Sequence, residues 1–135
     1  MGSMMVIDSS AWVAMILGED DAEKYSHAIG AAIARSERIY IPASVIVEAG
    51  VVLDRKGKVA RFDALLETLQ PEFVALDGKA AASARAAYAA FGKGIHPAGL
   101  NFGDCMSYAT CAVLGETLLF KGNDFPQTDI TSALH

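Results

Sequence analysis

Residues 4–10 read Met4-Met5-Val6-Ile7-Asp8-Ser9-Ser10, an apolar run that ends at one acid and two serines. A short run without polar residues is typical of a strand buried on both faces, because a strand with one wet face would alternate. Similar runs predict strands at residues 39–41, 73–76 and 117–120, and residues 129–131 are a candidate fifth strand. This pattern favours a parallel sheet that is covered on both sides.

Helical segments separate the predicted strands. They are expected over residues 11–17, 22–34, 43–56, 59–69, 79–91 and 102–114. Ser9 or Ser10 is expected to cap the first helix. Strands that alternate with helices predict the α/β class, here as a single three-layer domain with a central parallel sheet of four or five strands flanked by helices.

Length and composition narrow the class of protein. A chain of 135 residues fits one domain, and 53% hydrophobic with 20% charged residues excludes intrinsic disorder. No apolar run reaches the roughly 18 residues of a membrane span. No basic segment precedes the apolar start, as one would in a secretory signal, so we expect a cytoplasmic protein. Residues 1–3 (Met-Gly-Ser) are typical of a cloning remnant, which leaves residues 4–135 as the domain.

The charge of the chain bears on its partners. A net charge of −5 argues mildly against nucleic-acid binding, since phosphate contacts need lysine and arginine. Four basic residues nevertheless fall in one short stretch, Arg55, Lys56, Lys58 and Arg61. They form either a solvated helix end or a local strip that binds an RNA backbone.

Four acids stand near the carboxyl ends of predicted strands, where ligands collect in open α/β sheets. Asp8 ends the first strand, Glu48 lies in the helix after the second, Asp104 begins the helix at 102–114, and Asp124 follows the strand at 117–120. Three of them have simple structural interpretations: Asp8 as a helix cap, Asp104 as a favourable charge at a helix N-terminus, and Asp124 as a turn residue.

Glu48 is harder to explain by structure alone. It is the only charge within residues 43–53, and no lysine or arginine lies at helical spacing in that run. An acid in such apolar surroundings must be paired, neutral or bound to a metal ion. Glu48 therefore carries the strongest single indication of a functional site.

A metal ion would reconcile four acids at one end of a sheet. Converging carboxylates repel one another, and Mg²⁺ or Mn²⁺ resolves this because hard cations prefer oxygen ligands. Zinc is disfavoured, since the chain has few histidines and its two cysteines, Cys105 and Cys111, are six apart on one helix and are expected in the core. Ions held by carboxylates support hydrolysis of phosphodiester bonds, with Ser10, Asn101 and Lys121 as candidates to orient a water, a ligand or the phosphate.

Four segments carry a resemblance to a known family. Val6-Ile7-Asp8-Ser9-Ser10-Ala11 resembles the opening motif of PIN domains, in which an aspartate ends the first strand and a hydroxyl residue stands two positions later. The family's glutamate segment is similar to residues 42–48, its third motif to residues 101–105, and its fourth to residues 119–125. The order and spacing of the motifs match over essentially the whole chain.

The size of the chain and its last two motifs look most like the VapC group of toxins. The resemblance implies an Mg²⁺-dependent endoribonuclease, held inactive by a cognate antitoxin and usually a homodimer. It carries over Asp8, Glu48, Asp104 and Asp124 as metal-binding and catalytic acids, with Ser10 and Asn101 in support. The Asp124 position is the most variable of the four in the family.

Two alternatives remain open. A non-catalytic PIN-like domain would bind only RNA or a protein partner, and a phosphoacceptor or aspartyl phosphatase domain would also place an aspartate after its first strand. The helix at 11–17 has apolar residues around most of its circumference. It is either fully buried or part of a groove, shared with the next helix, that takes an antitoxin helix.

Overall fold

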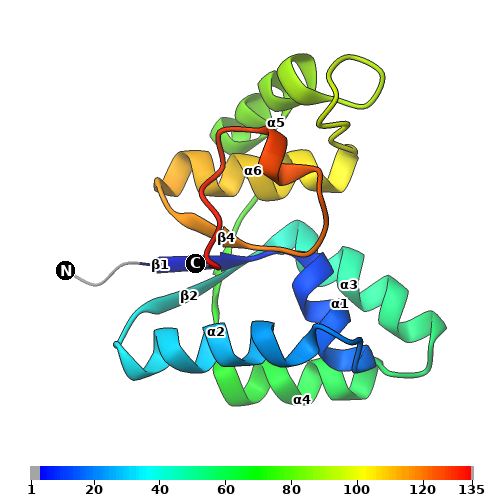
Figure 1. Cartoon of the computed structure of the whole chain (residues 1–135), viewed down its shortest axis with the longest axis vertical. Helices are drawn as coiled ribbons and strands as arrows, with labels where there is room; N and C mark the ends of the chain where they lie inside the picture. The colour runs from blue at the N-terminus through cyan, green and yellow to red at the C-terminus, as the bar shows by residue number, and fades with distance from the viewer. Residues whose placement is uncertain (1–3, 135) are drawn as a thin grey trace.

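The computed structural model describes residues 4–134, so the expected cloning remnant at residues 1–3 lies outside the described part of the chain. Four parallel strands form the sheet: β1 (Met4–Ile7), β2 (Arg38–Pro42), β3 (Glu72–Val74) and β4 (Thr117–Leu119). Their order is β3-β2-β1-β4, which puts β1 between two neighbours (Figure 1). The predicted α/β class with a central parallel sheet is confirmed.

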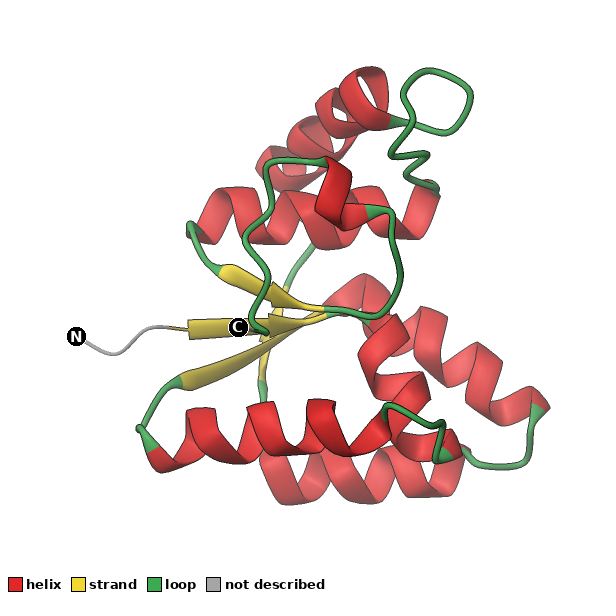
Figure 2. Ribbon diagram, viewed as in Figure 1, coloured by secondary structure: helices red, strands yellow, loops and turns green. Residues whose placement is uncertain are grey.

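Helices cover both faces of this sheet. They are α1 (Ser9–Leu17), α2 (Ala22–Ala34), α3 (Ala43–Arg55), α4 (Val59–Leu69), α5 (Gly78–Phe91) and α6 (Phe102–Leu114), followed by the 3₁₀ turn η1 (Phe125–Gln127). Figure 2 shows α5 and α6 on one face and α2 and α4 on the other. Helices α1 and α3 begin where β1 and β2 end, at the right of the view.

The strands divide the core into two apolar clusters. Successive side chains of a strand point to opposite faces. Met5 and Ile7 accordingly pack with α1 to α4, whereas Val6 between them packs with α5 and α6. Leu118 and Leu119 of β4 divide in the same way. Burial on both faces explains why the strands read as continuous apolar runs.

Two local predictions were wrong. Asp8, and not Ser9 or Ser10, caps α1, because helical geometry already begins at Ser9 and the Asp8 carboxylate accepts from the Ser10 amide. This confirms the other interpretation drawn from the sequence, in which Asp8 is the helix cap. The candidate fifth strand at residues 129–131 does not form. The chain there makes only an isolated parallel bridge, between Leu118 and Ser132.

The prediction for the two cysteines is confirmed. Cys105 and Cys111 are free and buried, as predicted for core cysteines. Within residues 4–134, none of the helices has the length and apolarity that crossing a membrane requires.

Candidate active site

Asp8 is held at the end of the central strand by three hydrogen bonds. Its side chain is only 2% exposed. One carboxylate oxygen, Oδ2, accepts from the Ser10 amide at 3.1 Å and the Ser10 hydroxyl at 2.6 Å. The other, Oδ1, accepts from the buried Ser107 hydroxyl of α6 at 2.5 Å. A buried carboxylate needs such donors, so Asp8 is both the cap of α1 and a rigidly oriented acid.

Glu48 approaches the same end of the sheet from α3. Its carboxylate lies against Gly103, in the first turn of α6, where an added Cβ would collide with it. Burial and then the charge of Asp8 raise the pKa of Glu48, while the Ser9 side chain opposes the shift. Within residues 4–134, no basic side chain forms an ion pair with Glu48. Glu48 is thus partly buried and, within the described residues, has no basic partner.

Asp104 is fixed by the start of α6. Its amide donates to Asn101 Oδ1 at 2.8 Å, and its Oδ2 accepts from the Asn101 amide at 3.0 Å, which together form a capping box. Burial raises the pKa of Asp104 to about 6, with further contributions from the charges of Asp8, Asp124 and Glu48. Asn101 therefore orients Asp104, and the Asp104 charge interacts with those of the other three predicted acids.

Asp124 is the least constrained of the four acids. It is exposed, lies between β4 and η1, and makes no side-chain cap bond to that turn. Its charge nevertheless contributes to the raised pKa of Asp104. Asp124 is therefore near enough to belong to the cluster while remaining open to solvent.

The structure brings the four acids to one end of the sheet but not to a single point. In the described part of the chain, no three acidic, histidine or cysteine side chains lie close enough together to hold one metal ion as they stand. Serine hydroxyls hold the two oxygens of Asp8, and like charges resist closer approach. Coordination of one ion by several of these acids therefore requires a change of side-chain rotamers or water molecules that bridge the ion to the carboxylates.

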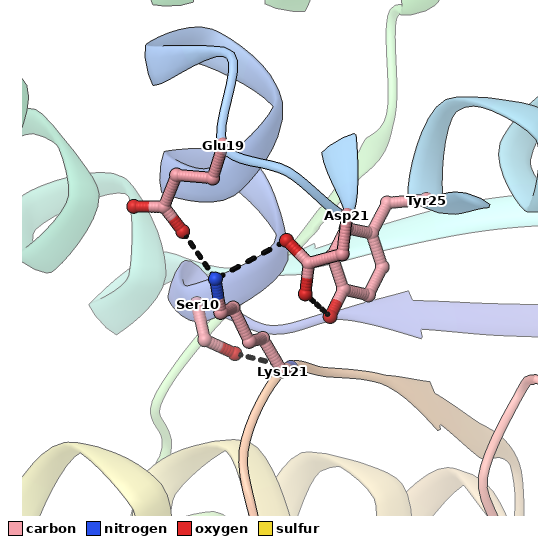
Figure 3. Close-up of polar contacts among 5 residues, drawn as sticks. All are labelled: Ser10, Glu19, Asp21, Tyr25 and Lys121. Carbon is pink, nitrogen blue, oxygen red and sulfur yellow. Dashed lines mark hydrogen bonds and ion pairs between the residues drawn. The ribbon is translucent and has the colours of Figure 1, made fainter. Parts of the chain in front are cut away.

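Lys121, a predicted supporting residue, directs its side chain to two acids other than the four predicted ones. Its Nζ lies 2.6 Å from a carboxylate oxygen of Glu19 and 3.1 Å from one of Asp21. Figure 3 shows the lysine nitrogen between the two acids. These hydrogen bonds raise the pKa of Lys121 well above its ordinary value. Its backbone amide donates to Ser10 Oγ at 2.9 Å. Ser10 therefore connects Asp8 to the loop after β4.

A cavity of about 400 Å³ opens beside Glu48. Its lining is Ser9, Ser10, Val13, Glu19, Glu48, Val52 and Lys121. Arg55 follows Glu48 by seven residues, so the two share a face of α3 about 10 Å apart along its axis. Arg55, Lys56 and Arg61 are exposed and Lys58 is half-buried. The basic stretch thus begins on the face of α3 that carries Glu48.

Comparison with known proteins agrees with this arrangement. The profile of the PIN domain matches residues 5–130. Ribonuclease VapC28 of Mycobacterium tuberculosis is 45% identical over 136 residues, which cover 96% of this chain and 98% of that protein. The chain belongs to the PIN-domain family. Within that family it groups with the VapC ribonucleases, which removes the phosphoacceptor alternative.

Solved structures show the same PIN fold. Mycobacterium tuberculosis VapC20, described as a Sarcin-Ricin loop cleaving toxin, superposes with a TM-score of 0.73 at 16% identity, covering 94% of this chain and 96% of that one. A toxin-antitoxin complex from Klebsiella pneumoniae gives a TM-score of 0.70 at 15% identity, covering 96% and 97%. At such identities the likeness concerns the fold alone.

Three residues of this PIN-domain site were not predicted from the sequence. Ser107 donates to Asp8 across 99 positions, and Glu19 and Asp21 bind Lys121 across about 100. Ser107 did carry a signal, because it lies one helical turn after Asp104 within a largely apolar helix. Glu19 and Asp21 read only as acids that precede a helix.

Proposed function

We propose that this VapC ribonuclease is a metal-dependent endoribonuclease toxin that hydrolyses RNA phosphodiester bonds and is inhibited by a cognate antitoxin. The observation that carries the proposal is the placement of Asp8, Glu48, Asp104 and Asp124 at one end of the sheet, where Ser107 orients Asp8, Asn101 orients Asp104 and Glu48 lies against Gly103. Burial, and then the charges of the other three acids, raise the pKa of Asp104 there. Clustered acids destabilise one another unless a cation compensates them. Since RNA is the substrate, we expect the protein to act in the cytoplasm.

The donor set fits Mg²⁺, with Mn²⁺ as an alternative. Asp8, Glu48, Asp104 and Asp124 offer only carboxylate oxygens, the ligands that hard cations prefer. When bound, the ion would supply Lewis-acid stabilisation of the scissile phosphate and acidify a water for attack. The chain's own residues prepare this site: Ser10 and Ser107 fix the orientation of Asp8, and Asn101 fixes that of Asp104.

We infer that the RNA enters along the cavity beside Glu48. The basic residues Arg55, Lys56, Lys58 and Arg61 would neutralise backbone phosphates on the way to the acids. A local strip of this kind reconciles RNA binding with the net charge of −5. The interior of the cavity is more polar where Ser9 and Ser10 line it and more apolar at Val13 and Val52.

The direct test measures cleavage of a single-stranded RNA with Mg²⁺ and with EDTA, using antitoxin-free protein. We expect Glu48→Gln to lose activity by about two orders of magnitude or more, because one metal ligand is gone. Glu67→Gln, an exposed position in α4, is the matched control and should cleave like the parent. Parent-like cleavage by Glu48→Gln, or by the parent in EDTA, would refute the proposal and favour a non-catalytic or metal-free domain.

The antitoxin is proposed to dock on an apolar cavity between α1, α2 and α4. The cavity measures about 270 Å³ and its apolar lining includes Met15, Ile16, Ile29, Ile33, Leu65 and Leu69. Ile33 is 48% exposed at its rim. An amphipathic helix inserts apolar side chains into such grooves. Helix α1 itself is mostly buried, with Trp12 fully so, and only its Met15 and Ile16 reach this surface.

A homodimer is proposed through another apolar surface. A cavity of about 470 Å³ between α5 and α6 is lined by Leu76, Tyr88 and Phe102 among others. These three side chains are 48%, 43% and 81% exposed. A second copy of the chain would bury them, as apolar surfaces of this kind mark protein contacts.

A further inference from the structure

The polar network around Lys121 joins three segments that are far apart in the sequence. Its side chain reaches Glu19 and Asp21 in the loop between α1 and α2, while its amide donates to Ser10 at the start of α1 (Figure 3). Ser10 in turn donates to Asp8. Lys121 and Ser10 therefore link the α1–α2 loop to the acid at the end of β1, through hydrogen bonds of the Lys121 side chain on one side and of its backbone amide on the other.

Asp21 has a further partner that fixes its orientation. The Tyr25 hydroxyl donates to Asp21 Oδ2 at 2.9 Å, which leaves Oδ1 for Lys121 at 3.1 Å. Tyr25 is almost fully buried, at 1% exposure. Since packing restrains a buried ring, the Tyr25 hydroxyl fixes the orientation of the Asp21 carboxylate.

Lys121 also lies near the start of the loop that carries Asp124. Gly122 directly after it has a φ of +113°, a conformation that side chains rarely adopt. The chain turns sharply there and reaches Asp124 two residues later. Anchoring Lys121 at both its side chain and its amide therefore sets the point from which this turn starts.

The ion pairs are too exposed to serve stability alone. The side chains of Lys121, Glu19 and Asp21 are 40%, 36% and 25% exposed. Pairs of this kind contribute little to folding, because solvent screens them. The three charges are better explained by what they position, namely Asp8 through Ser10 and Asp124 through the loop after β4.

We propose that Glu19 and Asp21 are positioning residues, which hold Lys121 so that loop 121–124 keeps Asp124 near Asp104 and keeps Ser10 hydrogen-bonded to Asp8. The inference rests on the proposed nuclease function and names residues that act through others, without touching RNA. It differs from a role for Lys121 in binding phosphate. A phosphate contact would be weakened by the two acids, whereas positioning requires them.

The two roles predict opposite effects of the double variant Glu19→Gln/Asp21→Asn. Freed from its acids, a phosphate-binding Lys121 would lower KM for RNA and leave kcat intact. A positioning Lys121 would lose its anchor, so kcat should fall by about tenfold to a hundredfold with KM unchanged. Lys121→Met should show the same fall in kcat, and Lys121→Arg should recover most of it because arginine can also bind two carboxylates.

The matched control is Asp20→Asn/Glu23→Gln. Both residues are exposed; Asp20 lies in the same loop and Glu23 in the first turn of α2, and neither makes a side-chain hydrogen bond or ion pair within residues 4–134. This control removes the same two negative charges, so both doubles have a net charge of −3 instead of −5. Any change that the two doubles share is an effect of net charge and not of position.

Hydrogen exchange in metal-free protein supplies a second readout that needs neither RNA nor Mg²⁺. Amides of residues 121–124 should exchange faster in the Glu19→Gln/Asp21→Asn double than in the parent or the control. Unchanged exchange, unchanged kcat, or a lower KM with intact kcat would each overturn the inference. If the parent itself does not cleave RNA, the proposed function fails, and the exchange experiment still decides whether the acids hold the loop.

Discussion

Asp8 concentrates more interactions than any other acid of the candidate site. Its carboxylate caps α1, accepts from Ser107 of α6 and is linked through Ser10 to the loop after β4. The three hydrogen bonds that the carboxylate itself accepts, from the Ser10 amide, the Ser10 hydroxyl and the Ser107 hydroxyl, are strengthened by the charge of the acceptor. Asp8 therefore contributes to the fold as well as to the proposed chemistry, and the two contributions can be separated by experiment.

Replacing Asp8 with Asn should cost both stability and activity. The shape is kept, but three charge-assisted hydrogen bonds become neutral or are rearranged, which should lower the free energy of unfolding by about 1–3 kcal/mol. RNA cleavage should fall by orders of magnitude, and added Mg²⁺ should no longer raise the melting temperature. Thermal melting with and without Mg²⁺, together with a cleavage assay, measures both effects.

A second capping aspartate provides the control. Asp77 caps α5 by accepting from the Ala80 amide at 2.9 Å, and it is exposed. Asparagine caps helices nearly as well as aspartate, so Asp77→Asn should change stability by less than about 0.5 kcal/mol and leave cleavage intact. An Asp8→Asn protein that behaves like Asp77→Asn would reduce Asp8 to a helix cap.

Asp104 predicts a pH dependence of stability. Its pKa is raised to about 6 from an ordinary value of 3.8, so the folded state favours the protonated form. The resulting stabilisation is complete below the ordinary pKa and is lost as the pH rises through about 6. Without divalent cations, Asp104→Asn should therefore melt at a higher temperature than the parent at about pH 7.5, and the difference should shrink towards about pH 4.5.

Melting curves across this pH range in EDTA test the expectation. Mg²⁺ should stabilise only the parent at neutral pH and reverse the order of the two proteins. If the difference in melting temperature between parent and Asp104→Asn stays constant with pH, ionisation of Asp104 does not destabilise the folded state.

At the scale of helices and strands, the sequence was informative where the local pattern determines structure. The bounds of α2, α4 and α6 were predicted as they are observed. In α6 both ends are defined locally, by the Asn101–Asp104 capping box and by Gly115. The fifth strand failed since pairing depends on a partner edge, and residues 131–133 contact β4 only around Leu118. Local sequence carries no information about that edge.

The basic stretch between α3 and α4 should determine the salt dependence of RNA binding. The test changes four residues together to alanine: Arg55, Lys56, Lys58 and Arg61. RNA binding should weaken. The slope of log affinity against log salt concentration should become shallower by about 0.7 for each phosphate that the protein no longer neutralises. Binding titrations at several salt concentrations measure the slope. Lys24→Ala/Lys79→Ala, on other helices, is the control, and an equal slope in all proteins would assign the stretch to the solvated surface.

The groove between α1, α2 and α4 should control antitoxin binding without affecting catalysis. Ile33→Glu puts a charge at its half-exposed rim, so affinity for the antitoxin should fall by at least about tenfold, since a desolvated charge is costly. Cleavage by the free protein should be unchanged. Val113→Glu, 38% exposed on α6, is the control in titration calorimetry, and equal affinities for both variants would move the antitoxin elsewhere.

For the whole molecule, the proposed dimer makes a simple prediction about mass in solution. Leu76→Glu should shift the protein from dimer to monomer, because it places a charge in the cavity between α5 and α6. Ile95→Glu is the control, because Ile95 is similarly exposed, at 58%, but lies in the loop after α5. It should leave the dimer intact. Light scattering at several concentrations distinguishes them. A parent that is monomeric throughout would contradict the dimer.

The candidate site was only partly predictable because its connections span the whole chain. Asp8, Glu48, Asp104 and Asp124 could be named from short motifs and from their places after strands. The Ser107 hydroxyl that orients Asp8 is 99 residues away from it in the sequence. The acids that hold Lys121 lie near the other end of the chain. Which donor meets which acceptor follows from strand order β3-β2-β1-β4, and that order is not written in any local pattern.

The close approach of α3 and α6 at Gly103 has a consequence for mutations of its codon. A Cβ there would strike the Glu48 carboxylate, which is the end of a flexible side chain and can move aside without disturbing the backbone. Every single-base change of a glycine codon that alters the amino acid adds a Cβ or ends translation. Codon 103 is thus a place where one base can displace an acid of the site and still leave a folded protein.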